Sequence, residues 1–316
     1  MKPASGLCNM SCEYCFYCDE ASKRLQNSYG FMSEQTLKNT IRKTMLRTEG
    51  SIHYAFQGGE PTLCGIDFFK KALVYQKQYN KNNIEVTNAL QTNGFALTDE
   101  WCSFFKENNF LIGLSVDGIR EIHDSYRHTK TGDDTFDRMI NSAKLLDKHK
   151  VDYNILTVVT SKVAKNISDI YKFYNKQGWK YQQYIACLDP INEVRGAKPY
   201  SLTPKVYGKF LIELFDLWYK DYKNGKDPYN RQFINYINLA GGYMAESCEQ
   251  NGVCGIQTVV EADGSVYPCD FYAMDEYRLG NFNENNLSEI DKKRSEICFI
   301  EKSLKLDSGC RECKYY

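Results

Sequence analysis

The chain has 316 residues, of which 42% are hydrophobic and 25% are charged, and this composition is ordinary for a globular protein of one large or two medium-sized domains. Its formal net charge is zero, which argues against nucleic acid or an anionic membrane as the main partner. No run approaches the roughly eighteen apolar residues of a membrane span, and no charged-then-apolar leader opens the chain, so we expect a cytoplasmic protein.

The first expected feature is a cysteine loop near the start of the chain. Cys8, Cys12 and Cys15 are spaced C-x3-C-x2-C. A [4Fe–4S] cluster in an ordinary electron carrier takes four cysteine thiolates, so three on one short loop would leave one iron open for another ligand. The alternatives are a zinc loop, although zinc favours paired C-x2-C or C-x4-C sites, and a disulfide staple.

Cysteines gather near both ends of the chain. The total of thirteen is odd, which argues against complete disulfide pairing in a reducing compartment. We therefore interpret the end clusters as metal or iron–sulfur sites and expect a reducing, low-oxygen environment. The isolated cysteines of the middle read as small hydrophobic side chains, and they are Cys64, Cys102 and Cys187.

The middle of the chain alternates short apolar runs with amphipathic patterns. The runs predict strands over His53–Gln57, Ile84–Leu90, Leu111–Val116, Tyr153–Thr160 and Gln182–Ile185. Between them the period of the apolar residues predicts helices over Ile66–Tyr79, Asp99–Glu107, Asp134–His149 and Ala164–Lys176. This alternation favours an α/β fold of parallel βα units, a full or partial (β/α) barrel with its site at the carboxyl ends of the strands.

Polar residues follow three successive predicted strands. The segments are Gln57-Gly58-Gly59-Glu60-Pro61, Gln91-Thr92-Asn93-Gly94 and Ser115-Val116-Asp117-Gly118. Each alone is compatible with ordinary turn chemistry, since Gly, Asn and Asp are turn residues. Three in succession favour a ligand site at that edge of the sheet.

The pattern changes after Pro190. A polar stretch to Pro204 precedes a helix with Tyr207, Phe210, Leu211, Leu214, Phe215 and Trp218 on its apolar face. Further on, Asp263-Gly264 between apolar runs predicts a hairpin with a two-residue turn. Cysteines surround it as Cys254-x9-Gly264-x4-Cys269 and Cys310-x2-Cys313, which indicates a small module held by metal, either iron–sulfur clusters or a zinc ribbon.

These motifs resemble a known family. The cysteine loop, with an aromatic residue on each side of Cys15, is similar to the cluster loop of radical S-adenosylmethionine (radical SAM) enzymes, and the later cysteines resemble the SPASM module. Nearly the whole chain resembles the anaerobic sulfatase-maturating enzymes, through Phe56–Leu63, Leu90–Gly94, Cys187–Pro190 and Tyr267–Tyr272.

The resemblance implies a partial (β/α)6 radical SAM barrel over residues 1–225 and a SPASM-type module over residues 226–316. It implies a [4Fe–4S] cluster on Cys8, Cys12 and Cys15, whose open iron chelates the methionine part of SAM. The implied contacts to SAM are Tyr14, Gly58, Gly59, Ser115, Arg127 and Leu188. The implied ligands of two auxiliary [4Fe–4S] clusters are Cys248, Cys254 and Cys269 for the first, and Cys310 and Cys313 for the second.

The resemblance also implies an activity. Enzymes of this kind oxidise a Cys or Ser of a sulfatase, in a Cys/Ser-x-Pro/Ala-x-Arg segment, to Cα-formylglycine through a 5′-deoxyadenosyl radical. A flavodoxin or ferredoxin would supply electrons. Asp270, directly after Cys269, matches the catalytic acid/base, although it could also be a turn or capping carboxylate. Arg127 could instead form a surface ion pair.

The sequence departs from the family pattern at both ends. The family continues past Cys313 with further ligands, whereas this chain ends at Tyr316, and most of the expected first strand would precede Lys2. We therefore expect a truncated module, in a fragment or in a protein without complete auxiliary sites. Two other functions stay open: a maturase that forms thioether or other crosslinks in a ribosomal peptide, and a zinc-stabilised binding protein without catalysis.

Overall fold

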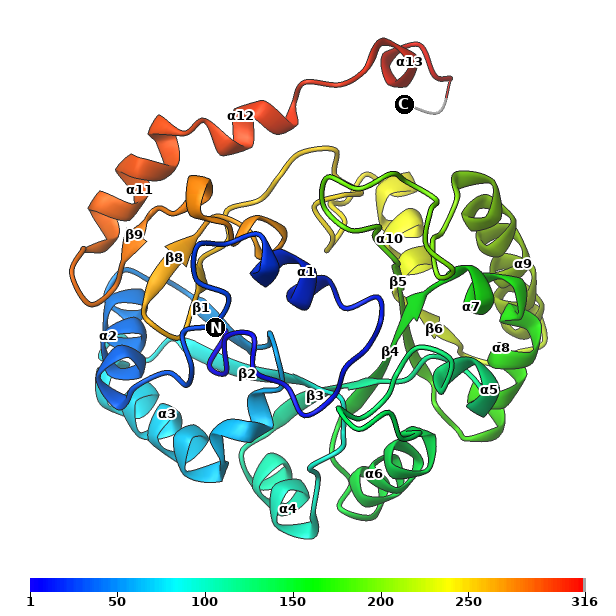
Figure 1. Cartoon of the computed structure of the whole chain (residues 1–316), viewed down its shortest axis with the longest axis horizontal. Helices are drawn as coiled ribbons and strands as arrows, with labels where there is room; N and C mark the ends of the chain where they lie inside the picture. The colour runs from blue at the N-terminus through cyan, green and yellow to red at the C-terminus, as the bar shows by residue number, and fades with distance from the viewer. Residues whose placement is uncertain (315–316) are drawn as a thin grey trace.

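The computed structural model describes residues 1–314 and is built around a sheet of six parallel strands. The strands pair in chain order, so that β1 and β6 form the two edges, and Figure 1 shows helices along the outside of their arc. This arrangement confirms the predicted partial (β/α)6 barrel. The strands are β1 (Ser51–Phe56), β2 (Glu85–Thr92), β3 (Phe110–Ser115), β4 (Tyr153–Val159), β5 (Tyr181–Ala186) and β6 (Tyr229–Asn230).

Helices before, between and after these strands complete the fold. They are α1 (Phe16–Ser22), α2 (Glu34–Met45), α3 (Ile66–Tyr79), α4 (Asp99–Glu107), α5 (Arg120–His123), α6 (Phe136–Lys148), α7 (Ser161–Lys165), α8 (Ile167–Lys176), α9 (Pro204–Lys223), α10 (Arg231–Ala240), α11 (Leu287–Glu296), α12 (Phe299–Ser303) and α13 (Ser308–Arg311). Three short 3₁₀ turns are η1 (Pro61–Cys64), η2 (Asp270–Tyr272) and η3 (Asp275–Tyr277).

The predicted elements agree closely with these bounds. All five predicted strands form, with ends within two residues, and α3 and α4 have the predicted bounds. The single helix predicted over residues 164–176 is wrong, because Asn166 adopts φ −124° and ψ 22° and separates α7 from α8. The short β6 was not predicted, since a strand of two residues has no measurable period.

Local capping and aromatic packing explain why α4 forms where it does. The Thr98 hydroxyl accepts a hydrogen bond from the Trp101 backbone N–H at 3.4 Å, which satisfies one of the free donors at the helix start. The buried face then packs on α3 and on the sheet: the Trp101 ring lies 5.6 Å from Phe69 of α3, and the Phe105 ring lies 5.8 Å from Phe110 of β3. Edge-on and tilted ring pairs of this kind stabilise a core beyond their buried area.

The C-terminal part forms a second, antiparallel sheet of β7 (Val259–Val260), β8 (Ser265–Tyr267) and β9 (Gly280–Asn281). The predicted hairpin is present, but its two-residue turn is wrong. The Glu261 N–H donates to the Ser265 carbonyl and the Gly264 N–H to the Glu261 carbonyl, both at 2.9 Å, so the loop has three residues, 262–264, and ends on Gly264 at φ +91°.

The first two residues join the two sheets. The Met1 amino group donates to the Ala55 carbonyl at 2.7 Å, and the Gln57 N–H donates to the Met1 carbonyl at 3.0 Å, which is the pattern of a parallel ladder along the edge of β1. The Lys2 N–H donates to the Val260 carbonyl of β7 at 2.8 Å. The edge of the barrel is therefore linked through residues 1–2 to the C-terminal module.

The predicted boundary between the two domains at residue 225 stays a prediction. Strand β6 and helix α10 follow that boundary in the chain, yet β6 pairs with β5 of the barrel sheet. Among the helices of residues 1–314, none is both long enough and apolar enough to cross a membrane.

Candidate active site

The cysteine loop lies between residues 1–2, which pair along the edge of β1, and helix α1. Cys15 is the N-terminal cap residue of α1, and its N–H donates to the Cys12 carbonyl at 3.1 Å. Backbone hydrogen bonds from Ser11 to the His128 carbonyl and from Glu13 to the Tyr126 carbonyl, at 2.8 and 3.0 Å, hold the loop against the segment after α5. All three predicted ligand cysteines of the loop are partly buried.

The thiols of this loop suit iron only as thiolates. Burial raises the pKa of the Cys8 and Cys12 thiols to about 11, and a hydrogen bond with Cys18 together with burial raises that of Cys15 well above its usual range. A bound cation would reverse this, because ligation stabilises the deprotonated sulfur. Within residues 1–314 no three His, Cys, Asp or Glu side chains converge on a single ion. Three thiols on one loop fit a larger cluster, in which each sulfur binds a different iron.

Gly58 and Gly59 allow the end of β1 to approach this loop. A Cβ on Gly59, which has φ +57°, would lie 2.3 Å from the Leu7 carbonyl oxygen. A Cβ on Gly58, at φ +87°, would lie 2.8 Å from Cε of Lys2. The Glu60 N–H donates to the same Leu7 carbonyl at 2.8 Å. Bare backbone is therefore needed here for close contact with residues 2–7.

Glu60 connects two strand ends to the cysteine loop, a role that sequence reasoning missed. Its buried carboxylate accepts hydrogen bonds from the Thr62 hydroxyl at 2.6 Å, the Thr92 hydroxyl at 2.9 Å and the Asn93 N–H at 2.8 Å. The Asn93 amide in turn lies 3.6 Å from the Cys8 sulfur. Burial raises the pKa of Glu60, and these donors oppose that shift. The only sequence signal was an acidic residue after two glycines.

Arg127 forms a buried contact with Tyr14 and Asp117. Its Nη1 donates to the Tyr14 hydroxyl at 2.9 Å and lies 3.8 Å from the Asp117 carboxylate, which also accepts from Tyr14. The Arg127 side chain is 7% exposed, so the alternative of a surface ion pair is wrong. Burial disfavours its charge, yet Tyr14, Cys12 and Asp117 outweigh that and raise its pKa. Its Nε is buried and has no hydrogen-bond partner in residues 1–314, so this donor stays available.

The other predicted SAM contacts lie at the same edge of the sheet. Ser115 is the last residue of β3, and Leu188 follows the end of β5 by two residues and is 49% exposed. Because carboxyl ends of parallel strands meet at one edge, these positions share that edge with Gly59. Among the six predicted contacts, the structure records a direct hydrogen bond between Tyr14 and Arg127.

A cavity of about 400 Å³ lies inside the arc of strands. Polar side chains from successive strands line it, among them Gln57, Gln91, Asn154 and Gln183. An ion pair of Arg231 with Glu246, at 2.9 Å, also lines it. A cavity with many amide groups suits a ligand with its own donors and acceptors, such as a polypeptide backbone.

Asp270 lies where the C-terminal module meets helix α1. The Tyr17 hydroxyl donates to Asp270 Oδ2 at 2.8 Å, whereas Oδ1 is buried and has no partner in residues 1–314. The Phe271 ring packs edge-on against Phe16 at 5.0 Å. A free acceptor oxygen beside a fixed one suits a carboxylate that receives a proton. Tyr17 was missed from the sequence, where an aromatic residue two positions after Cys15 is the only signal.

The C-terminal cysteines separate into two groups. Cys248, Cys254 and Cys269 are partly buried, and burial, together with the charges of Asp270, Cys248 and Cys254, raises the pKa of Cys269 to about 11. Cys310 and Cys313 are exposed on and after α13, which Figure 1 shows at the end of an extended segment.

Comparisons with known proteins agree with this geometry. Residues 3–174 match the Radical SAM superfamily, and residues 252–314 match the SPASM iron–sulfur cluster-binding domain. The chain is 44% identical over 316 residues to a cysteine-type anaerobic sulfatase-maturating enzyme of Clostridium novyi, across 100% of this chain and 84% of that one. It is 32% identical to a serine-type enzyme of Bacteroides thetaiotaomicron, across 100% and 79% of the two chains.

A solved structure supports the same assignment. The fold superposes with a TM-score of 0.95 on native anSMEcpe with bound AdoMet, at 43% identity, over 99% of this chain and 86% of that one. The chain is therefore a radical SAM oxidoreductase and belongs to the anaerobic sulfatase-maturating enzymes.

Proposed function

We propose that this protein oxidises a cysteine of a sulfatase polypeptide to Cα-formylglycine. The observation that supports the proposal most is the hydrogen bond of Tyr17 with Asp270, because Tyr17 lies on helix α1, whose cap residue is the predicted cluster ligand Cys15. We favour cysteine over serine as the target since the chain is more similar to the cysteine-type relative than to the serine-type one.

We assign the SAM-binding [4Fe–4S] cluster to Cys8, Cys12 and Cys15. The thiols suit it because they lie on one loop and are half-buried. When bound and reduced, the cluster and SAM supply a 5′-deoxyadenosyl radical, which removes a hydrogen atom from Cβ of the substrate cysteine. Arg127, with its unpartnered Nε, and Tyr14 are the side chains that would orient SAM, while Gly58, Gly59, Ser115 and Leu188 would contact it at the strand ends.

Asp270 would accept the proton that must leave the substrate. After loss of the Cβ hydrogen atom, the substrate loses the thiol proton and one electron to become a thioaldehyde, and water then replaces sulfur to give the aldehyde and hydrogen sulfide. Oδ1 of Asp270, which accepts no hydrogen bond within residues 1–314, would be the acceptor for the proton. The electron would leave through an auxiliary cluster on Cys248, Cys254 and Cys269, since Cys269 adjoins Asp270.

The substrate segment would enter the cavity inside the strands. Its amide side chains suit an extended Cys/Ser-x-Pro/Ala-x-Arg peptide, whose backbone needs hydrogen-bond partners. Flavodoxin or ferredoxin would deliver the electron that reduces the cluster, and Cys310 and Cys313 would serve the second auxiliary cluster. Reduction of the cluster and oxidation of the substrate would both take place in the cytoplasm.

The test is an anaerobic assay of the reconstituted protein with SAM, a chemical reductant and a Cys-x-Pro-x-Arg peptide, read by mass spectrometry. We expect formylglycine in place of cysteine, less product from the matched Ser peptide, and none from an Ala peptide. A product that has lost two hydrogens, retains its sulfur and does not hydrolyse to the aldehyde would instead indicate a crosslinking maturase, since the thioaldehyde has the same mass but reacts with water. Absence of 5′-deoxyadenosine in every reaction would refute the proposal.

A further inference from the structure

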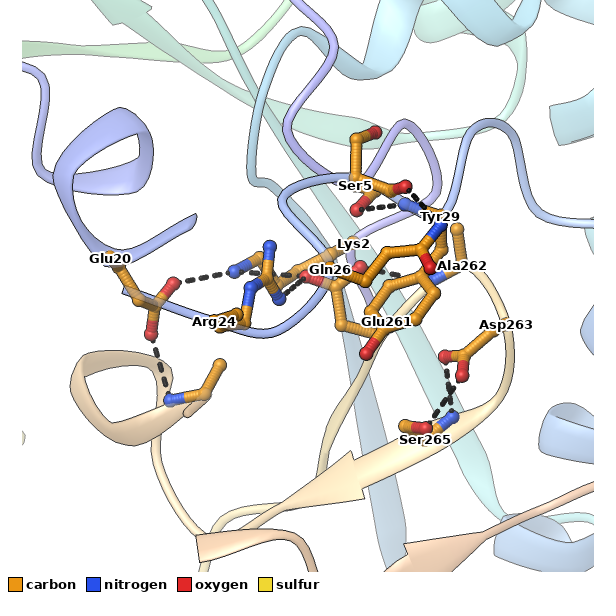
Figure 2. Close-up of polar contacts among 12 residues, drawn as sticks. Lys2, Ser5, Glu20, Arg24, Gln26, Tyr29, Glu261, Ala262, Asp263 and Ser265 are labelled. Atoms are coloured by element: carbon orange, nitrogen blue, oxygen red, sulfur yellow. Dashed lines mark hydrogen bonds and ion pairs between the residues drawn. The ribbon is translucent and has the colours of Figure 1, made fainter. Parts of the chain in front are cut away.

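Four charged side chains are buried together where the barrel meets the C-terminal module. Lys2 and Arg24 are the cations, and Glu20 and Glu261 are the carboxylates, each with a side chain no more than 1% exposed. The Lys2 ammonium lies 2.8 Å from Glu20 and 3.3 Å from Glu261, and Arg24 lies 2.6 Å from Glu261. Figure 2 shows Glu20 on one side of this group and Glu261, from the hairpin turn, on the other.

Glu20 has a second contact that reaches the segment of Asp270. Its Oε2 binds Lys2, while its Oε1 accepts the backbone N–H of Ala273 at 2.8 Å. Ala273 is the residue directly after the 3₁₀ turn η2, which begins at Asp270. Since Tyr17 and Glu20 are three residues apart on α1, they lie on one helix face. The helix therefore holds η2 at both ends, at Asp270 through Tyr17 and at Ala273 through Glu20.

Lys2 keeps Glu20 in place. Besides its ion pairs, its ammonium lies 5.1 Å from the Tyr17 ring centroid, and its stem contacts the position where a Cβ of Gly58 would be. Burial disfavours the charge on Lys2, but Glu261 and Glu20 outweigh that and raise its pKa. The Lys2 side chain thus contacts Gly58 after β1, Glu20 of α1 and Glu261 of the C-terminal hairpin.

Stability alone does not explain this arrangement. Buried ion pairs can often be replaced by apolar side chains without loss of stability, whereas removal of one partner leaves an uncompensated charge. The bond from Ala273 to Glu20 is the part that an apolar pair could not reproduce. What it controls is the position of η2, and therefore of Asp270.

We propose that Glu20 is a positioning residue that holds Asp270 in reach of the substrate by binding the Ala273 N–H. This inference rests on the function proposed above. Loss of the contact releases one end of η2 and moves the carboxylate, while the cysteine loop and the SAM contacts stay in place. Radical formation then continues without product formation.

The experiment compares two double variants that both leave the buried group electrically balanced through Arg24 and Glu261. Lys2→Met/Glu20→Gln retains an acceptor for the Ala273 N–H, and Lys2→Met/Glu20→Met has nearly the same shape without one. The readouts are bound iron, the ratio of formylglycine to 5′-deoxyadenosine, and hydrogen exchange of the Ala273 amide in the reconstituted full chain.

We expect the Gln variant to stay within about twofold of the unaltered ratio, whereas the Met variant falls at least about tenfold, since a misplacement near 1 Å can cost about 10²-fold. The Ala273 amide should exchange faster only in the Met variant. Equal ratios in the two variants, at equal bound iron, would overturn the proposal.

Two further measurements apply if the Met variant does not fold or if the unaltered protein makes no product. If the Met variant does not fold, Ala273→Pro removes the same N–H at a residue with φ −81°. Since proline also strains the 3₁₀ backbone of Tyr272 before it, the decisive result is an unchanged ratio, which would also overturn the proposal. If the unaltered protein makes no formylglycine, the proposed function fails, but exchange of the Ala273 amide still tests the contact. Equal exchange in the Gln and Met variants would refute it.

Discussion

Replacement of Gly59 by alanine tests the closest backbone approach in the candidate site. An alanine Cβ would lie 2.3 Å from the Leu7 carbonyl oxygen and 2.9 Å from that of Ser5, both backbone atoms directly before the cysteine loop. Because no flexible side chain is involved, the loop itself must move. The same substitution also forces a side chain into the left-handed region at φ +57°.

The size of the effect follows from these two costs. A left-handed alanine costs about 1–2 kcal/mol. Displacement of Leu7 breaks its hydrogen bond with the Glu60 N–H, 2.8 Å long, which adds about 0.5–1.5 kcal/mol. The sum is about 1.5–3.5 kcal/mol in unfolding free energy. If about 1.4 kcal/mol of it falls on the SAM site, the Kd for SAM rises about tenfold.

Gly178→Ala is the matched control. Gly178 has φ +74° after the end of α8 and no atom within 4 Å of its would-be Cβ, so it incurs the conformational cost alone. Urea unfolding gives the stabilities, and equilibrium dialysis of the anaerobically reconstituted proteins gives the Kd for SAM. We expect Gly178→Ala to lose about 1–2 kcal/mol with unchanged SAM affinity. The same Kd in both variants would refute the reasoning.

Three further changes test the cluster ligands, the carboxylate Asp270 and a buried histidine at the end of α5. Replacing Cys8, Cys12 and Cys15 together by Ala should abolish 5′-deoxyadenosine formation, and continued SAM cleavage would contradict the ligand assignment. Asp270→Asn should lower formylglycine output about 10²-fold or more while 5′-deoxyadenosine still forms; unchanged output would remove this carboxylate from the mechanism. Burial lowers the pKa of His123 well below 6.5, so the unfolded chain binds a proton that the folded one does not. Its contribution to stability is therefore present above pH ~6.5 and should fall by up to about 1.4 kcal/mol per unit below it, a slope that His123→Gln should remove in urea unfolding.

Much of the barrel was predictable from local pattern. Strand and helix periods depend on neighbours within a few residues, so β4 began at the predicted Tyr153 and α3 had its predicted ends. The break at Asn166 was missed because apolar residues continue at helical spacing across it. The hairpin was predicted from Asp263-Gly264, but its loop length depends on which carbonyl the Gly264 N–H reaches.

The candidate site was predictable only in part. Spacing alone indicated the loop of Cys8, Cys12 and Cys15, and resemblance to a family supplied Asp270 and Arg127. Their ligand and catalytic roles stay predictions. Sequence offered no means to tell whether Arg127 is a surface residue, since its burial depends on Tyr14 and Asp117, which lie in separate segments.

The sequence by itself determined the alternating βα pattern, the cysteine loop and the family. The tertiary structure alone decided how Asp270 is held, because Tyr17 and Glu20 each contact η2 across a separation of 253 residues. It also decided the pairing of Lys2 with Glu20 and Glu261. Contacts over such distances have no local signature: they exist only when packing removes these charges from water and leaves each one with a specific partner.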